Sequence, residues 1–305
     1  MATVREIRRR IKSVKNIAQI THAMQAVAAS RMLRAQEAVL ATRPYAQRAW
    51  TVLTHLAAQR AETEEIHPLL QVRTVEKVAV VLLTSDRGLC GAFNTNIIRR
   101  ALEYLEALPV PADVVAVGRK GRDMMLRRGQ SLVAEFSDLP AQPTLADLTP
   151  IARIVLDGFL DGTYDTVCMA YTDFINTLRQ EPVIRRLLPL MPTEMDKQAM
   201  AEHVEEVTPE TVEVPEYIYE PDPRTILDTV VPRFTELQVY QAVLESLASE
   251  HSARMVAMRN ATENAEALTQ DLQLTYNKAR QQAITSEIMD IAGGAEALAQ
   301  ARAAS

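Results

Sequence analysis

The residues best placed to bind an anion lie in two glycine-bearing stretches near the middle of this 305-residue chain. Residues 88–91 (GLCG) and 118–121 (GRKG) each follow an apolar run, which is where an α/β protein binds phosphate. The first stretch lacks the three-glycine dinucleotide pattern, and the second lacks the spacing to a Gly-Lys-Ser or Gly-Lys-Thr sequence. We therefore predict that both stretches are structural turns and that the chain holds no cofactor.

Cys90 is the one candidate nucleophile in these stretches, because a helix N-terminus can lower the pKa of a thiol. A nucleophilic thiol also needs a base, and none of the five histidines (residues 22, 55, 67, 203 and 251) is near Cys90 in sequence. Cys168 is the second cysteine and is equally isolated, so neither a disulfide framework nor a zinc site is predicted. We expect no catalytic residue and no metal site, and we interpret His251 as a packed polar position.

The middle of the chain alternates strand and helix patterns. An aliphatic, β-branched run at 78–83 precedes a helical pattern at 94–108. Further strand patterns follow at 113–117, 166–171, 182–190 and 213–219, and further helical patterns at 119–128 and 145–160. This alternation predicts a parallel sheet covered by helices, in a Rossmann-like α/β domain over residues 74–220. Within it, residues 191–222 hold ten acidic side chains and a single lysine, which is typical of a solvated, mobile loop.

The two ends of the chain read as long helices. Residues 1–59 contain no glycine and one proline, Pro44, which we expect to kink or break the helix locally. Residues 223–292 form the second helix, which we expect to stop at the Gly293–Gly294 pair and leave a tail over 293–305. Apolar residues recur at three- and four-residue spacing in both; the N-terminal stripe is Ile7, Ile11, Val14, Ile17, Ile20, Met24 and Val27.

The two helices most simply pair as a long antiparallel coiled coil, with the α/β domain inserted between them. About 60 helical residues make a rod of roughly 90 Å, which its own chain cannot bury. The C-terminal helix looks longer than its partner, so its last apolar turns imply a sleeve formed by another protein. The alternative is an ordinary bundle in which the helices fold back, but the absence of glycine and proline counts against it.

Charge is concentrated in the N-terminal helix. The chain carries 39 acidic and 33 basic side chains, yet residues 1–48 hold ten basic side chains against Glu6 and Glu37. The basic face includes Arg8, Arg9, Arg31 and Arg34. This face predicts an acidic partner, and we favour protein carboxylates over nucleic acid because the aromatic residues of an RNA-binding surface are missing.

No membrane span is predicted, because no stretch reaches the roughly 18 apolar residues that a spanning helix needs. The first twelve residues are polar and Arg-rich with no apolar block behind them, so we also expect no signal or transit peptide. The cysteine content is typical of an intracellular protein. Any membrane attachment is therefore expected to go through a partner.

Several segments together resemble the gamma subunit of F-type ATP synthases, the central rotor stalk. The resemblance runs in order along nearly the whole chain, and three separated motifs are more specific than any single one. The matching segments are residues 7–8 and 20–32 (ITHAMQAVAASRM), 85–91 (SDRGLCG), 219–223 (YEPDP), 238–241 (QVYQ), 249–258 (SEHSARMVAM) and 276–281 (YNKARQ).

The resemblance implies a non-catalytic shaft that transmits torque between a membrane ring of c subunits and the catalytic alpha-beta hexamer. It implies the hexamer, the epsilon subunit and the c-ring as partners, and a peripheral position on the cytoplasmic side of a bacterial inner membrane. Five residues match family positions that contact the hexamer: Met24, Arg254, Arg280, Gln281 and Thr285.

The chain departs from many relatives in its longer acidic segment, 191–214, and in a tail that continues past the usual stop. No cysteine pair of the redox-regulated chloroplast kind is visible. The alternative functions are a coiled-coil adaptor or a nucleic-acid-binding arm, with an enzyme built on the α/β domain in third place.

Overall fold

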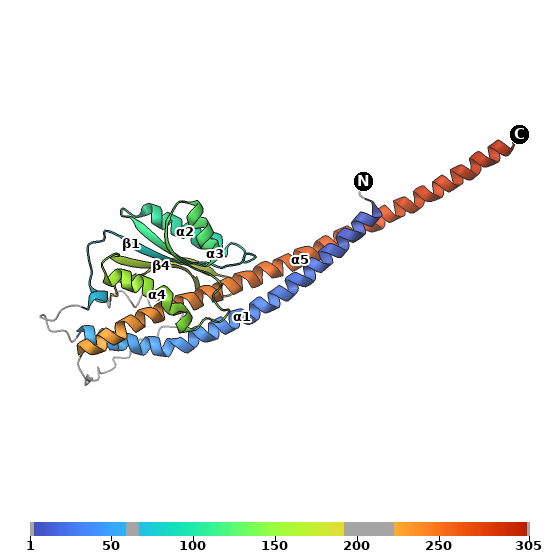
Figure 1. The fold of residues 1–305 in the computed structure, drawn as a ribbon. Helices are drawn as coiled ribbons and strands as arrows, with labels where there is room; N and C mark the ends of the chain where they lie inside the picture. The colour runs from blue at the N-terminus through green and yellow to red at the C-terminus, as the bar shows by residue number, and fades with distance from the viewer. Residues whose placement is uncertain (1–2, 59–66, 192–222, 304–305) are drawn as a thin grey trace. The chain divides into compact units, whose positions relative to one another are not determined.

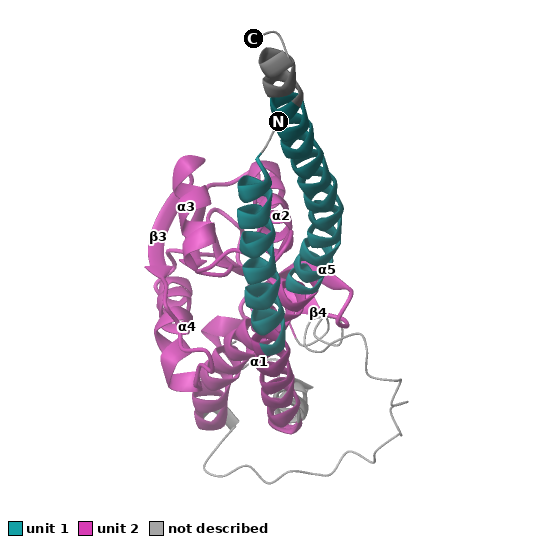
Figure 2. Ribbon diagram, turned by 90° about the vertical axis from the view of Figure 1, so that its right-hand side faces the viewer, with its two compact units in different colours: residues 1–26, 257–305 teal, residues 27–256 magenta. Residues whose placement is uncertain are grey.

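The computed structural model describes residues 3–58, 67–191 and 223–303, in two compact units (Figures 1 and 2). Unit 1 comprises residues 1–26 and 257–305, and unit 2 comprises residues 27–256. The helices α1 (Val4–Ala58) and α5 (Pro223–Ala303) each contribute to both units. The acidic segment 192–222, with its expected strand at 213–219, lies outside the described residues.

Unit 2 contains a five-stranded sheet in the order β3-β2-β1-β4-β5. Its strands are β1 (Val78–Leu83), β2 (Ala112–Val117), β3 (Ser131–Phe136), β4 (Thr166–Phe174) and β5 (Gln180–Leu188). The first four strands are parallel, which confirms the predicted α/β domain, whereas β5 is antiparallel to β4. The edge strand β3 was not predicted, because its side chains are exposed or half-buried and carry no continuous apolar run.

Helices cover both faces of this sheet (Figure 1). α2 (Phe93–Ala107) and α3 (Arg119–Arg127) lie on one face, and α4 (Leu145–Leu160) lies with α5 on the other. A short 3-10 turn, η1 (Pro68–Leu70), inserts Leu69 into the core on the α4 side. Side chains of β1 alternate between the two cores, so all six of its residues are buried and the strand reads as one apolar run.

The core on the α4 side extends onto α5 through Val231, Phe234, Val239, Ala242 and Val243. Burial of apolar surface is worth about 25 cal/mol for each Å², so these contacts stabilise the packing of the sheet against α5. The sheet and this part of α5 therefore share one core.

The helices α1 and α5 run antiparallel within unit 2. Gln241 donates from Nε2 to Thr42 Oγ1 over 3.3 Å, while Arg31, earlier in α1, is close enough to His251 to affect its pKa. In unit 1, the Oγ1 atoms of Thr21 and Thr262 are 2.7 Å apart in a buried hydrogen bond. The predicted coiled-coil pairing is confirmed.

The predicted stripe on α1 was only partly right. Ile7 and Ile11 are buried, but Ile17, Ile20 and Val27 are 49%, 59% and 52% exposed. From residue 18 onwards the buried seam lies one residue later; small residues occupy it at heptad spacing (Thr21, Ala28 and Ala35), and Met32 is buried with them. Small side chains allow two helix backbones to approach closely, which turns the larger apolar side chains outward.

α1 does not break at Pro44, and the stop predicted at the Gly293–Gly294 pair was wrong. α1 continues through Pro44, and α5 continues through Gly293 and Gly294 to Ala303, so the tail 293–305 is mostly helical. A proline removes one backbone hydrogen bond, and a glycine costs about 1 kcal/mol relative to alanine. Neither penalty ends a helix of 55 or 81 residues. None of the described helices combines the length and apolarity that a membrane crossing requires.

Candidate functional site

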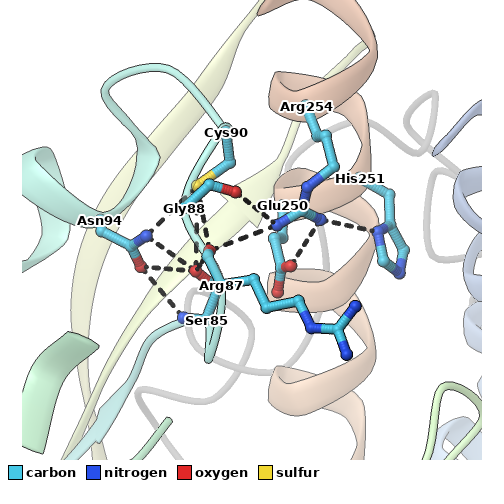
Figure 3. Close-up of polar contacts among 8 residues, drawn as sticks. All are labelled: Ser85, Arg87, Gly88, Cys90, Asn94, Glu250, His251 and Arg254. Carbon is cyan, nitrogen blue, oxygen red and sulfur yellow. Dashed lines mark hydrogen bonds and ion pairs between the residues drawn. The ribbon is translucent and has the colours of Figure 1, made fainter. Parts of the chain in front are cut away.

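The loop that follows β1 is fixed by its own side chains (Figure 3). The Ser85 amide donates to Asn94 Oδ1 over 3.0 Å, and Ser85 Oγ donates to the Arg87 carbonyl over 2.6 Å. Asn94 Nδ2 donates to Ser85 Oγ over 2.7 Å and to Cys90 Sγ over 3.2 Å. Residues 85–91, which we call the β1 loop, are thereby held against the first turn of α2.

Asp86 occupies the position at which a phosphate would meet the N-terminus of α3. Its Oδ1 accepts the amide of Arg119 and its Oδ2 accepts the amide of Asp138, each over 3.0 Å. A carboxylate at a helix N-terminus satisfies free amide donors and complements the helix dipole. The chain therefore supplies its own anion at this edge of the sheet.

The glycines of the GRKG stretch have a packing role. Gly118 has φ +95°, and a Cβ there would lie 2.1 Å from the Thr84 carbonyl oxygen. A Cβ on Gly121 would lie 2.8 Å from Thr84 Oγ1, which accepts the Gly121 amide over 2.8 Å. These contacts bring the start of α3 against the end of β1, as expected for a structural turn.

Cys90 is not arranged as a nucleophile. It is 2% exposed, and its burial raises the pKa of the thiol against the opposing effects of the Ser85 hydrogen bond and the Arg254 charge. A protonated thiol is a weak nucleophile.

We predict that Cys90 resists alkylation in the native chain, because its thiol is both protonated and enclosed. Iodoacetamide at pH 7 should modify it at least about 100-fold more slowly than a thiol in the urea-unfolded chain. Peptide mass spectrometry separates Cys90 from Cys168, which is buried as well. Rapid native labelling of Cys90 would contradict this account.

Arg254 on α5 contacts the β1 loop directly (Figure 3). Its Nη2 donates to the carbonyl oxygens of Gly88 and Arg87, over 3.3 and 3.4 Å. Its Nη1 forms an ion pair with Glu250 Oε1 at 2.6 Å, and the two side chains are only 12% and 13% exposed. The ion pair is thus largely desolvated, where a charge-assisted bond is stronger than on an open surface, whereas the two carbonyls belong to exposed loop residues.

The pKa values of Glu250, in this ion pair, and of the neighbouring His251 are shifted from their ordinary values. Burial raises the pKa of Glu250, while the neighbouring Arg254 opposes that rise. Burial, with the charges of Arg254 and Arg31, lowers the pKa of His251 to about 4, so the imidazole is neutral at pH 7. His251 is 5% exposed, which confirms a packed polar position. Among the described residues its Nε2 has no hydrogen-bond partner.

The other residues singled out from the sequence lie on helix surfaces. Arg280, Gln281 and Thr285 are exposed on α5 within unit 1, where Thr285 Oγ1 donates to the Gln281 carbonyl over 2.9 Å. Met24 is half-buried on α1. The basic face is exposed: Arg8 and Arg9 in unit 1, and Arg31 and Arg34 in unit 2.

The sequence reasoning missed Glu250, the partner of Arg254. Its position four residues before an arginine on a predicted helix was an available signal for an ion pair. No such signal existed for the carbonyls of Arg87 and Gly88, which are 167 and 166 residues away from Arg254. Across the described ranges, no group of three or more His, Cys, Asp or Glu side chains could hold a metal ion.

Comparison with known proteins identifies the family. A family model described as ATP synthase matches residues 3–298. The ATP synthase gamma chain of Dehalococcoides mccartyi strain CBDB1 is 48% identical over 299 residues, which cover 98% of this chain and 100% of that protein. The ATP synthase gamma chain of Roseiflexus castenholzii is 49% identical over 304 residues, with the same coverage. This chain belongs to the ATP synthase gamma-chain family.

Solved structures share the gamma-chain fold. A chain of the Euglena gracilis mitochondrial ATP synthase, in an OSCP/F1/c-ring structure, has a TM-score of 0.64 at 23% identity, covering 97% of this chain and 94% of that one. A chain from the central stalk/c-ring structure of the Tetrahymena thermophila mitochondrial ATP synthase has a TM-score of 0.57 at 24% identity, covering 79% and 99%. At these identities the similarity shows the fold, and it agrees with the fold expected from the motifs.

Proposed function

We propose that this chain is the central rotor shaft of an F-type ATP synthase and carries torque between a ring of c subunits and an alpha-beta hexamer. The observation that carries the proposal, beside family membership, is the end of α5. Every side chain from Arg280 to Ala295 is exposed, including Ile284, Ile288 and Ile291. Exposed apolar surface on this scale is typical of an interface with another protein.

The proposed sleeve is the inner surface of the hexamer. α1 adds apolar side chains to the surface of unit 1 through Ile17 and Ile20, which are exposed on the same helix as the basic residues Arg8 and Arg9. Apolar surface suits a bearing that must slide, and the basic face suits acidic loops at the ends of beta subunits. We propose Met24, Arg280, Gln281 and Thr285 as hexamer contacts. We also propose Arg254 as a hexamer contact, and its guanidinium in addition binds groups of its own chain.

We propose further that the chain is a non-catalytic subunit that acts by changing the conformation of its partners' nucleotide sites. The epsilon subunit and the c-ring would bind unit 2, and ion flow through the ring would turn the chain. In this arrangement the chain is peripheral, on the cytoplasmic side of a bacterial inner membrane, and reaches the membrane only through its partners.

Co-purification tests the proposed function. The chain is tagged, extracted gently from membranes, and ATPase activity is measured with and without it. A stoichiometric alpha-beta hexamer whose turnover depends on the chain is the expected result. ATP turnover by the isolated chain would overturn the proposal. Recovery of the chain alone, or with nucleic acid, would instead favour an adaptor or a nucleic-acid arm, to which the exposed Arg8 and Arg9 are also suited.

A truncation after Met289 should weaken the bearing while leaving rotation possible. The deletion removes residues 290–305, but the paired part of the shaft in unit 1, which includes the Thr21–Thr262 hydrogen bond, is retained. ATP-driven rotation of single complexes is the measurement, and we expect slower or less regular stepping. Complete loss of assembly would contradict this prediction.

A further inference from the structure

We infer that Arg254, Glu250 and the carbonyls of Arg87 and Gly88 form a latch, the Arg254 latch, that transmits torque between the α/β domain and α5. This inference rests on the proposed function, because a latch carries torque only in a chain that turns. It gives Arg254 a positioning role inside its own chain. The contacts lead from α5 to the β1 loop and from there to the sheet.

On α5, the latch begins with a rigid pair. Glu250 and Arg254 are one helical turn apart, and their side chains are joined at 2.6 Å with little exposure. This ion pair orients the guanidinium, so that Nη2 faces the carbonyls of Gly88 and Arg87. Arginine suits this position because its planar group presents several donors in a fixed geometry, and one side chain can hold two acceptors and a carboxylate.

On the loop side, the two carbonyls belong to backbone that is itself fixed. Ser85 and Asn94 hold the loop to α2, and Asp86 holds it to the amides of Arg119 and Asp138. Leu89 has φ 64°, an unfavourable conformation for a bulky L residue, which persists only where surrounding contacts determine it. A displacement of Arg254 would therefore move the β1 loop, and through its hydrogen bonds also β1, α2, α3 and the residues that follow β3.

The same turn of α5 also forms hydrogen bonds with the connection between β4 and β5. Ser252 Oγ donates to the Thr177 carbonyl over 2.8 Å, and Gln180 Nε2 donates to Ser252 Oγ over 3.3 Å. Ser252 is fully buried. The turn that contains Glu250, Ser252 and Arg254 is thus attached to the sheet at two loops.

The hydrogen bonds of Arg254 and Ser252 fix the register between α5 and the sheet, which the apolar core alone does not. The core on the α4 side ends on α5 at Leu247, about 10 Å along the helix from Arg254 at 1.5 Å per residue. The hydrophobic effect is non-directional, whereas hydrogen bonds are directed and fix one register. Two attachments separated along the helix resist twisting of the sheet around α5 much better than one.

Hydrogen exchange of the full-length chain tests whether the latch exists. Arg254→Ala should raise amide exchange in peptides covering residues 84–94 about ten-fold, because the loop loses its hold on α5. Arg100→Ala, which removes an exposed arginine that pairs with Glu103, is the matched control and should leave these peptides unchanged. If Arg254→Ala lowers the melting temperature, Glu250→Gln keeps the side-chain shape and should still raise exchange. Unchanged exchange in both variants would overturn the latch.

Coupling in the reconstituted complex tests whether the latch carries torque. Glu250→Gln is the variant of choice, since Arg254 also matches a hexamer-contact position in the family. We expect ATP-driven pumping of the coupling ion per ATP hydrolysed to fall roughly three-fold. Arg254→Lys, which retains the charge but offers a single compact donor, should give an intermediate value. Arg100→Ala should pump as the unmodified complex does.

The outcomes separate the inference from the proposed function. If Glu250→Gln raises loop exchange but pumps normally, the latch is structural and the torque inference is wrong, while the rotor proposal stands. If the unmodified chain does not assemble with a hexamer, the proposed function fails. In that case the exchange experiment still decides whether the latch exists.

Discussion

Replacing Gly118 with alanine should destabilise unit 2 by roughly 3 to 5 kcal/mol, the sum expected for a severe overlap and an unfavourable backbone conformation. The new Cβ would lie 2.1 Å from the Thr84 carbonyl oxygen, at φ +95°. Thr84 cannot move away easily, because its amide and Oγ1 both donate to the Val117 carbonyl, over 2.8 and 3.0 Å. The Gly118 amide is also fixed, since it donates to the Phe136 carbonyl over 2.7 Å.

Urea denaturation followed by circular dichroism measures this effect, and Gly129→Ala is its control. Gly129 also has positive φ, +69°, but nothing lies within 4 Å of a Cβ placed there. Its replacement should cost only about 1 kcal/mol, the usual penalty for a left-handed alanine. Equal losses at the two positions would show that backbone conformation alone, without the overlap at Thr84, determines the role of Gly118.

The part of the fold that could be predicted is the part whose sequence pattern is local. Val78–Leu83 reads as a buried parallel strand because both of its faces are covered, and the absence of breakers marks α1 and α5. Strand β3 could not be recognised in this way, because an edge strand with exposed side chains has no apolar run. The direction of β5 is set by its pairing with β4, and periodicity carries no information about it.

The seam of the helix pair shows a second limit. Large apolar residues at the right spacing suggested Ile17, Ile20 and Val27, but the seam uses Thr21 and Ala28. The error arises because an apolar side chain that faces a partner protein and one that faces the chain's own helix look alike in sequence. Arg254 shows the same limit for the site, since its contacts in the β1 loop are far away along the chain.

Replacing Asp113 with asparagine should cost about 2 to 3 kcal/mol of stability at pH 7, because a buried carboxylate would lose its charge-assisted bonds. Asp113 is 7% exposed at the start of β2. It accepts from Lys77 Nζ at 2.7 Å, Ser131 Oγ at 2.6 Å and the Tyr164 hydroxyl at 3.1 Å. Asp113 and its three donors join the starts of β1, β2 and β3 to the turn between α4 and β4. Urea denaturation at pH 7 measures the loss, and Asp157→Asn, the same change on the exposed face of α4, should cost little.

The same experiment at lower pH should separate the contribution of the Asp113 charge to stability from the contribution of its side-chain packing. Burial alone would raise the pKa of Asp113, but the hydrogen bonds from Lys77, Ser131 and Tyr164 outweigh it and lower the pKa below the ordinary value of 3.8. The folded-state pKa is thus lower than the unfolded one, so this stabilisation is fully present above the unfolded value and is lost as the pH falls through the folded value. The stability difference between the unmodified chain and Asp113→Asn should therefore be constant from pH 7 to about pH 5 and shrink below about pH 4. A difference that persists unchanged at acid pH would show that packing of the side chain, and not its charge, holds this edge of the sheet together.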